Sequence, residues 1–277
     1  MKRIVLIIIA VFGMAVLCGK MSGEKVSAVG DEVVKLPIVM YHHISQNNDI
    51  LGPYVVSPNE LEEDLKYLRD SGYETVTLAQ LIRWHGGSGG LPEKPMMITF
   101  DDAHESTAIY AQPLLEKYGF TAVLAVIGAV AEQFTALDEH YEYSYMSWDV
   151  VKALGESGVF EIQSHTWDMH KLGERKGCRK KAEESSEDYA RELKADLEKF
   201  EDECRRLEIE TSRGIAFPFR KYSDESISIV RELGYLAGFT CNENVNYLSR
   251  KTGNLFELGR FNRAHGMPSA EFFTKWE

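Results

Sequence analysis

The chain has 277 residues, of which 44% are hydrophobic and 27% are charged, so its composition is that of a globular protein and excludes disordered and fibrous classes. Its formal net charge of −12 produces a surface that repels phosphate backbones, and we therefore expect no nucleic-acid partner. The four cysteines are too few for a disulfide scaffold and form no Cys-x-x-Cys pair, which argues against a zinc–thiolate site.

The N-terminal segment has the pattern of a targeting sequence. Lys2 and Arg3 precede an apolar run over residues 4–17, which is the length of a secretory signal and short for a membrane span. Small residues at 26–28 suit a signal peptidase, and an uncleaved membrane anchor is the alternative. We expect a secreted or extracytoplasmic protein that contacts a membrane only through this segment, if it stays uncleaved. The predicted parts are 1–28, signal peptide or anchor; 29–35, linker; and 36–277, a single catalytic domain.

Short apolar runs alternate with helical patterns along the rest of the chain. The predicted strands are Leu36–Tyr41, Tyr73–Thr77, Met96–Phe100, Thr121–Ile127, Val159–Gln163, Gly214–Pro218, Tyr235–Thr240 and Leu255–Arg260. The predicted helices are Ser57–Ser71, Ser106–Tyr118, Ser147–Ser157, Ser186–Leu207 and Ser223–Leu233. This alternation favours an α/β fold with parallel strands and outer helices, either a (β/α) barrel or a doubly wound open sheet.

Polar residues gather where four of these strands end. Asp101-Asp102, His42-His43, Phe219-Arg220 and the run from Ser164 to His170 each follow an apolar strand. In an α/β barrel the carboxyl ends of the strands meet at one rim, so these side chains should converge. One aspartate with two histidines would make a three-ligand metal site with an open position for water, and the other aspartate would be free to act as a base.

At these positions the chain resembles the polysaccharide deacetylases, the NodB-homology domains of carbohydrate esterase family 4. The motifs are Thr99-Phe100-Asp101-Asp102, Ser164-His165-Thr166 with His170, Met40-Tyr41-His42-His43 and Phe217-Pro218-Phe219. The Tyr-His motif and the His-x-x-x-x-His spacing resemble the branch of poly-β-1,6-N-acetylglucosamine deacetylases. The resemblance implies a distorted (β/α) barrel of about seven strands.

The resemblance also implies a role for each matched residue. Asp102, His165 and His170 correspond to ligands of a divalent metal, most simply zinc. Asp101 corresponds to the general base, and His42 to the general acid of this branch. Phe219 corresponds to the residue whose backbone N–H holds the developing oxyanion.

Three positions depart from the family pattern. Ala103 and Arg220 stand where glycine is usual, so we expect backbone strain at Ala103 and a bulky cation near the rim at Arg220. Ala216 stands where other branches carry an arginine that orients the base, and the branch that this chain resembles often lacks that arginine as well.

Three histidines compete for the role of general acid. His265 is favoured by branches in which the acid comes late in the chain, but it lies in a loop with glycine and proline. His42 follows a strand directly, and alternation along the strand should turn His43 the other way, into a packing role. We therefore expect His42 to be the acid.

The predicted function is that of a monomeric, metal-dependent hydrolase that removes N-acetyl groups from an N-acetylglucosamine polysaccharide of the cell wall or extracellular matrix. A catalytically silent glycan-binding barrel and an amidohydrolase acting on a different amide are the alternatives. Tyr141, Tyr143, Tyr145 and Trp167 are candidates for contacts with sugar faces.

Overall fold

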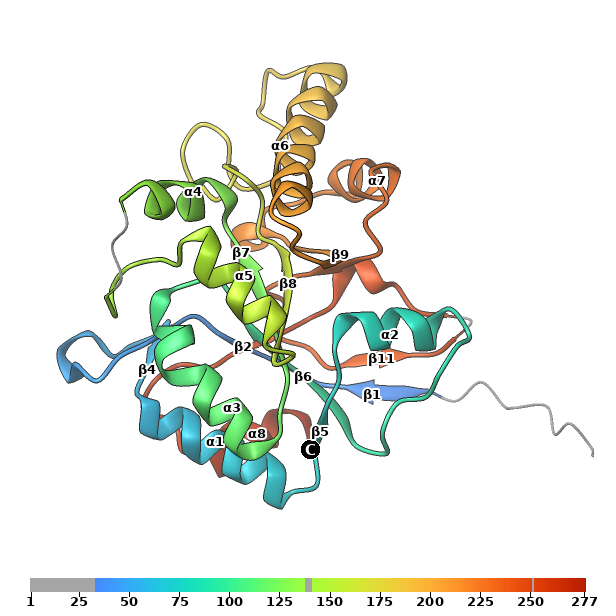
Figure 1. Cartoon of the computed structure of the whole chain (residues 1–277). Coiled ribbons are helices and arrows are strands. Elements are labelled where there is room, and N and C mark those ends of the chain that lie inside the picture. Colours follow the sequence, from blue (N-terminus) through green and yellow to red (C-terminus); the bar gives the residue numbers. More distant parts are fainter. Residues whose placement is uncertain (1–32, 138–140, 251) are drawn as a thin grey trace, which may run out of the picture. The chain divides into compact units, whose positions relative to one another are not determined.

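The computed structural model describes residues 33–137, 141–250 and 252–277 (Figure 1). The predicted signal or anchor, residues 1–28, and most of the predicted linker lie outside these residues. Within the described ranges, no helix combines the length and the apolar character needed to cross a membrane.

Seven parallel strands form one curved sheet in which six strands lie in chain order and the last strand lies beside the first. From one edge to the other the strands are β10 (Ala237–Phe239), β9 (Thr211–Ala216), β8 (Phe160–Ser164), β7 (Ala122–Val126), β6 (Pro95–Phe100), β2 (Ile38–Tyr41) and β12 (Phe261–Asn262). A short strand, β5 (Glu74–Thr75), also pairs with β6. The order runs with the chain from β2 to β10 and β12 then lies beside β2, so the doubly wound alternative is wrong and the barrel prediction is confirmed.

The segment 258–262 connects the two edges of this sheet. Leu258 pairs in parallel with Phe239 of β10, and β12 then pairs with Val39 and Met40 of β2. The predicted strand Leu255–Arg260 is wrong in its position, because its first half is the 3₁₀ turn η4 (Leu255–Glu257). The Asn254 side chain accepts a hydrogen bond from the Phe256 N–H and starts this turn, whose apolar side chains are buried as those of a strand would be.

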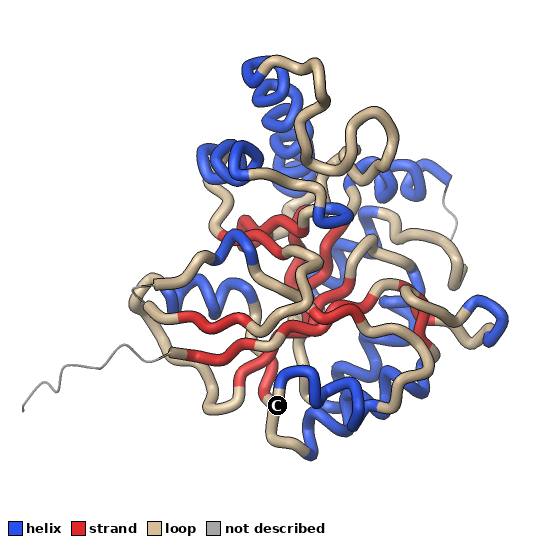
Figure 2. The backbone as a smooth tube through the Cα atoms, turned by 180° about the vertical axis from the view of Figure 1, so that it is seen from behind, coloured by secondary structure: helices blue, strands red, loops and turns tan. Residues whose placement is uncertain are grey.

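Helices cover the outside of the strands (Figures 1 and 2). They are α1 (Pro58–Asp70), α2 (Leu78–His85), α3 (Gln112–Tyr118), α4 (Gly128–Leu137), α5 (Trp148–Glu156), α6 (Ser186–Arg206), α7 (Asp224–Glu232) and α8 (Ser269–Phe273). Five of them match the predicted helices, and Ser57 with Glu60 forms the expected capping box of α1. The predicted helix 106–118 is divided, since its first part is the π-helical turn η2 (Thr107–Ala111) and α3 begins just before Pro113.

Three pairings outside the main sheet complete the fold. Pro37 divides the first predicted strand into β1 (Val34–Leu36) and β2, and β1 pairs antiparallel with β11 (Asn246–Leu248). Beyond His42, β3 (His43–Ile44) pairs with β4 (Val55–Val56) beside the carboxyl end of the barrel. The remaining short turns are η1 (Asn48–Ile50), η3 (Pro218–Arg220) and η5 (Thr274–Trp276).

A buried ion pair attaches the last strand to the first helix. Arg263 directly follows β12, and its Nε lies 2.7 Å from Oδ2 of Asp64 on α1. The Tyr41 hydroxyl, at the end of β2, donates to the same oxygen at 2.8 Å. Asp64 is fully buried and Arg263 is 2% exposed, so each charge depends on the other for compensation.

Replacing Arg263 with methionine should therefore destabilise the fold strongly. The substitution leaves the Asp64 carboxylate buried without its cation, and such losses cost about 3–5 kcal/mol. Denaturant unfolding followed by circular dichroism would measure the change. The double variant Asp64→Leu/Arg263→Met should recover part of the loss, because no charge is then stranded. A single variant as stable as the unaltered protein would show that the pair contributes nothing.

Candidate active site

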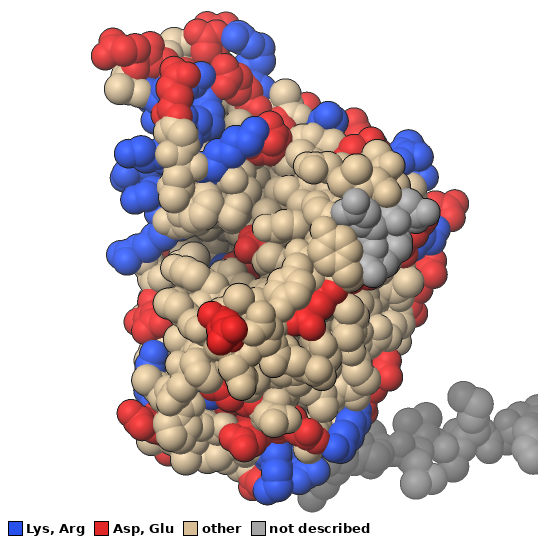
Figure 3. All heavy atoms as spheres, turned by 90° about the vertical axis from the view of Figure 1, so that its left-hand side faces the viewer, with Lys and Arg blue, Asp and Glu red and all other residues tan. Residues whose placement is uncertain are grey.

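The carboxyl ends of the barrel strands open into a cavity of about 820 Å³. Figure 3 shows this hollow, with acidic side chains at its base and largely uncharged residues around much of its rim. The cavity is lined by residues from all four strand ends singled out in the sequence, including His42, Asp101, His165 and Phe219. The convergence predicted from the barrel fold is therefore present.

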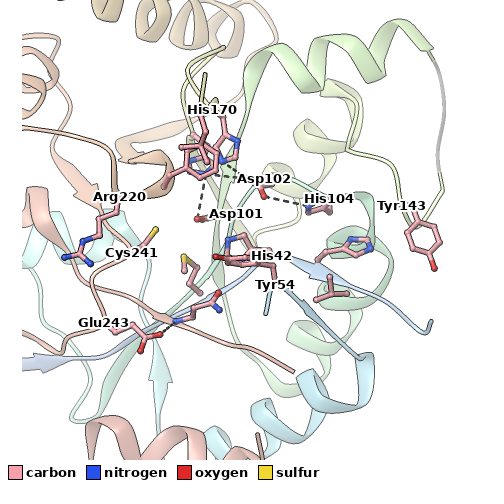
Figure 4. Close-up of a pocket in the computed structure, with 17 residues that line it drawn as sticks. His42, Tyr54, Asp101, Asp102, His104, Tyr143, His170, Arg220, Cys241 and Glu243 are labelled. Carbon is pink, nitrogen blue, oxygen red and sulfur yellow. Dashed lines mark hydrogen bonds and ion pairs between the residues drawn. The ribbon is translucent and has the colours of Figure 1, made fainter. Parts of the chain in front are cut away.

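The turn after β6 presents two neighbouring carboxylates to the cavity. Asp102 and Ala103 have φ values of 73° and 58°, in the left-handed region that favours glycine. The strain expected at Ala103 is thus present, and its carbonyl is held by the Met146 N–H at 2.9 Å. This turn directs the Asp101 and Asp102 side chains toward different partners. Figure 4 shows both aspartates in the wall of the cavity.

Asp102, His165 and His170 form a cluster suited to a metal ion. Oδ1 of Asp102 lies 3.4 Å from Nε2 of His165 and 3.3 Å from Nε2 of His170, and one donor atom from each residue lies within 4.8 Å of the others. Oδ1 of Asp102 is buried and accepts no hydrogen bond within the described part of the chain. A buried carboxylate oxygen facing two imidazole nitrogens fits a divalent cation with mixed O and N ligands.

Two contacts hold the histidines of this cluster in place. The His165 ring lies with Nδ1 2.7 Å from the Ala216 carbonyl of β9, so Nδ1 carries the proton and Nε2 is free to face Asp102. The loop that leads to His170 is held by Asp196 of α6, which accepts the Trp167 and Asp168 N–H groups at 2.8 Å each. The shape of this loop is therefore fixed by hydrogen bonds from its backbone to Asp196.

Burial and neighbouring charges both shift the pKa values of the residues in this cluster. Burial alone would raise the pKa of Asp102, but its close contact with His165 and the charges of His42 and His170 lower it overall. Burial lowers the pKa of His170 to about 4, assisted by the charge of His165. A neutral His170 and an ionised Asp102 are in the states that bind a metal. Burial would lower the pKa of His165, but the charges of Asp101 and Asp102 raise it overall, so a bound metal would displace a proton there.

Asp101 is held by an arginine that sequence reasoning missed. Arg260 lies just before β12, is fully buried, and donates through two nitrogens to the two oxygens of Asp101 at 2.7 and 2.8 Å. Although burial would raise the pKa of Asp101, the charge of Arg260 lowers it overall. Arg260 thus supplies the cation that is absent at position 216, from the segment just before β12.

The structure brings His42 to the cavity and leaves His265 outside it. His42 lines the cavity beside the two aspartates, with its ring edge against Tyr54 (Figure 4). Burial lowers the pKa of His42, while the charges of Asp101 and Asp102 act to raise it. His265 is 41% exposed and pairs with Glu60 at 2.9 Å. His265 lies in the loop expected for it, three residues after β12 ends at Asn262.

His43 and His104 form the wall beside Tyr143. His43 is buried and bonds through Nδ1 to the Ser106 hydroxyl at 3.0 Å, which agrees with the packing role expected for it. His104 was not singled out in the sequence. Its ring stacks on Tyr145 at 4.5 Å, and its Nε2 lies 3.8 Å from Oδ2 of Asp102. A histidine two residues after a metal-ligand candidate was the only sequence signal for it.

Phe219 projects from a strained turn after β9. Phe219 and Arg220 have φ values of 54° and 59°. The Phe219 ring lies 4.2 Å from the His170 ring, centroid to centroid, and is partly exposed at the rim. The turn therefore holds the Phe219 ring beside the ligand cluster, and the role expected for the Phe219 N–H stays a prediction.

The four aromatic candidates for sugar contact separate into two groups. Tyr143 is 48% exposed and lines the cavity. Tyr141 is exposed but does not line it, Tyr145 packs against His104, and Trp167 is buried against Trp148. Tyr54 lines the cavity and is 60% exposed, and sequence reasoning missed it.

Comparisons with known proteins agree with this geometry. The model of the polysaccharide deacetylase family matches residues 88–238. The poly-β-1,6-N-acetyl-D-glucosamine N-deacetylase of Staphylococcus aureus (strain MRSA252) is 28% identical over 191 residues, which are 69% of this chain and 62% of that protein. The enzyme of the same name from Escherichia coli (strain K12) is 33% identical over 121 residues, 42% of this chain and 18% of that protein.

Solved structures support the fold. The Streptococcus pyogenes deacetylase PplD, solved in complex with acetate, superposes with a TM-score of 0.71 and 24% identity over 89% of this chain and 100% of that one. Because the family match covers more than half of the sequence, the chain belongs to the polysaccharide deacetylase family, a family of hydrolases that act on the C–N bond of N-acetyl groups. The chain spans less than two thirds of the two named relatives, so their substrates do not transfer to it directly.

Removing the Arg260 cation should raise the pKa of Asp101. In Arg260→Gln the buried carboxylate loses the charge that opposes burial, so it should bind a proton at higher pH. The carboxyl carbon signal of Asp101, followed by NMR during a pH titration of the metal-free protein, measures this. Arg260→Lys keeps the charge and should shift the midpoint less. An unchanged midpoint in Arg260→Gln would show that Arg260 does not control Asp101.

Proposed function

We propose that this protein is a metal-dependent N-deacetylase of an N-acetylglucosamine-containing polysaccharide outside the cytoplasmic membrane. The observation that carries the proposal is the pairing of two different carboxylates in one cavity. Asp102 faces two histidine nitrogens, whereas Asp101 is gripped by an arginine. This difference supports a role for Asp102 in holding a cation and for Asp101 in accepting a proton.

Asp102, His165 and His170 would hold the divalent ion, most simply zinc. When bound, the ion would act as a Lewis acid toward the substrate carbonyl and lower the pKa of water. Three protein ligands leave the remaining coordination positions free, which a catalytic rather than a structural site needs. The Ala216 carbonyl and Asp196 would keep the histidines aligned with it.

Asp101 would accept the proton of the attacking water. Both of its oxygens already receive hydrogen bonds from Arg260, which fixes the direction of the carboxylate and keeps it ionised. Arg260 would thus act as a positioning residue, since it reaches the reaction through Asp101. The Phe219 N–H would stabilise negative charge on the acetyl oxygen as the tetrahedral carbon forms.

His42 would return a proton to the departing nitrogen. It shares the cavity with Asp101, and its Nδ1 is buried without a hydrogen-bond partner in the described chain. The C–N bond would break as this nitrogen takes the proton, and the products are acetate and a free amine on the sugar. Tyr54 and Tyr143 at the rim would contact the sugar rings.

The compartment and the assembly complete the proposal. The charged and apolar pattern of residues 1–28 supports export or anchoring, and the named relatives are poly-β-1,6-N-acetyl-D-glucosamine N-deacetylases. We propose a monomer that acts on a polymeric substrate without a further protein partner.

Acetate release tests the function directly. The metal-loaded protein should release acetate from N-acetylglucosamine oligomers of β-1,6 or β-1,4 linkage, and a chelator should abolish the release until zinc is returned. Acetate release that persists unchanged in chelator would contradict the proposed metal dependence. If no oligomer yields acetate, the result supports the alternative of a catalytically silent glycan-binding barrel. If only a different amide is hydrolysed, the result supports the alternative of an amidohydrolase acting on that amide.

Substitutions should separate the two neighbouring carboxylates. Asp101→Asn should keep the metal and lose activity by about two to four orders of magnitude, the usual contribution of a positioned base. Asp102→Asn and His170→Ala should lose stoichiometric metal, because each removes one of three ligands. Metal content by atomic absorption beside kcat measures both. If Asp101→Asn empties the site and Asp102→Asn does not, the two roles are reversed.

The general acid is tested by comparing two histidines. His42→Ala should retain metal and lose about two to four orders of magnitude in kcat, since the departing amine then lacks its proton donor. His265→Ala serves as the matched control and should keep most of the activity, because His265 lies outside the cavity beside Glu60. Loss of turnover in His265→Ala with activity kept in His42→Ala would overturn the choice.

A further inference from the structure

Residues 171–181 gather positive charge in an acidic protein. Six of their eleven residues are lysine or arginine and one, Glu174, is acidic, although the whole chain has a net charge of −12. This segment continues from the loop that carries His170, so its charges lie next to the candidate ligands in sequence. Figure 3 shows lysine and arginine side chains along one side of the hollow.

The segment packs against the turn that follows β9. The Cys178 N–H donates to the Lys221 carbonyl at 2.8 Å. Gly177 has a φ of 54°, and a Cβ there would lie 2.8 Å from the Pro218 carbonyl oxygen, so only glycine allows this approach. The contact brings the two loops together, and we call their four lysine and arginine residues that lack an acidic partner the basic patch: Lys176, Arg179, Arg220 and Lys221.

These four side chains have no carboxylate partner. Within the described chain, none of them lies within 4.0 Å of an acidic side chain, and Arg179 donates only to the Tyr222 carbonyl. The other cations of the segment are already neutralised. Lys171 pairs with Asp168, Arg175 with Glu184 and Glu192, Lys180 with Glu225, and Lys181 with Glu184 and Glu192.

The basic patch is continuous with the cavity. Arg220 lines the cavity, and among its described lining residues it is the only lysine or arginine. The acidic residue on that side, Glu243, is already engaged by Lys275 at 3.3 Å and by the Asn262 N–H (Figure 4). Arg220 is also held at a left-handed φ that favours glycine, so the chain keeps a long cation at this rim against the backbone preference.

We propose that the basic patch binds carboxylate or phosphate groups of the same polymer whose N-acetyl group enters the cavity. The substrate class is then an acidic N-acetylated glycan, and Arg220 connects the patch to the reacting sugar. This inference rests on the proposed deacetylase function. Unpaired guanidinium and ammonium groups attract such anions and raise their local concentration at the mouth.

Kinetics on matched oligosaccharides test the inference. We compare a neutral N-acetylglucosamine oligomer with one alternating N-acetylglucosamine and glucuronate, and with a 6-phosphorylated N-acetylglucosamine oligomer. At low salt the kcat/KM for an acidic oligomer should exceed that for the neutral one by about tenfold, through a lower KM, as expected for several exposed charge contacts. The preference should shrink at 0.5 M salt, roughly, where the Debye length is short. The two acidic arms show which group is preferred.

Two variants of equal charge change separate the patch from overall charge. Lys176→Gln/Arg179→Gln/Arg220→Gln/Lys221→Gln should bring the ratio of acidic to neutral kcat/KM close to one. The control, Lys66→Gln/Arg69→Gln/Lys117→Gln/Arg205→Gln, removes four exposed cations that do not line the cavity and should keep the ratio.

Each result decides one point. Acetate release without any preference for acidic oligomers overturns this inference and leaves the proposed function standing. No release from any oligomer overturns the proposed function itself. Patch-dependent binding to phosphatidylglycerol vesicles, with no preference among oligomers, assigns the patch to a membrane surface and overturns the glycan assignment.

Discussion

The site depends on one constraint, which is that two adjacent carboxylates lie together at the end of β6, with Asp101 buried and Asp102 only partly exposed. Neither could remain ionised there without a compensating charge. Arg260 compensates Asp101 through two hydrogen bonds, while Asp102 faces two histidines and carries an oxygen with no hydrogen bond in the described chain. The compensation is therefore asymmetric, and this asymmetry is what allows neighbouring residues of the same type to have different chemical roles.

Most of the fold could be predicted from local sequence patterns. Strands such as β7 and helices such as α1 have their hydrophobic period, caps and glycine stops within a few residues. The site residues next to strand ends were found for the same reason. Arg260 was not, because its partner Asp101 is 159 residues away in the chain and a single arginine after an apolar turn has many explanations. The last strand was misplaced because η4 buries its apolar residues without being extended.

Backbone strain collects around the cavity. Seven described residues other than glycine have a positive φ, and five of them, Asp102, Ala103, Thr166, Phe219 and Arg220, belong to the three loops that carry the candidate site. Such conformations persist only where surrounding contacts determine them, and here those contacts are the strand ends, Asp196 and the Cys178–Lys221 hydrogen bond. The loops are thus shaped by packing, and the side chains they carry are placed before any substrate arrives.

The distribution of paired and unpaired charges also determines where the surface can attract an anion. A protein with a net charge of −12 would repel an acidic polymer over most of its surface, so an unpaired basic patch has most effect where the polymer must approach. Arg220 joins the patch to the mouth, while Tyr54 and Tyr143 contribute uncharged aromatic surface to the same cavity. Under the proposed function, the neutral faces of the sugars would contact the aromatic rings of Tyr54 and Tyr143, and their acidic groups would contact the cations of the basic patch. Its direction across the cavity would then be set by charge, and the choice of which acetyl group reaches Asp101 would follow from that direction.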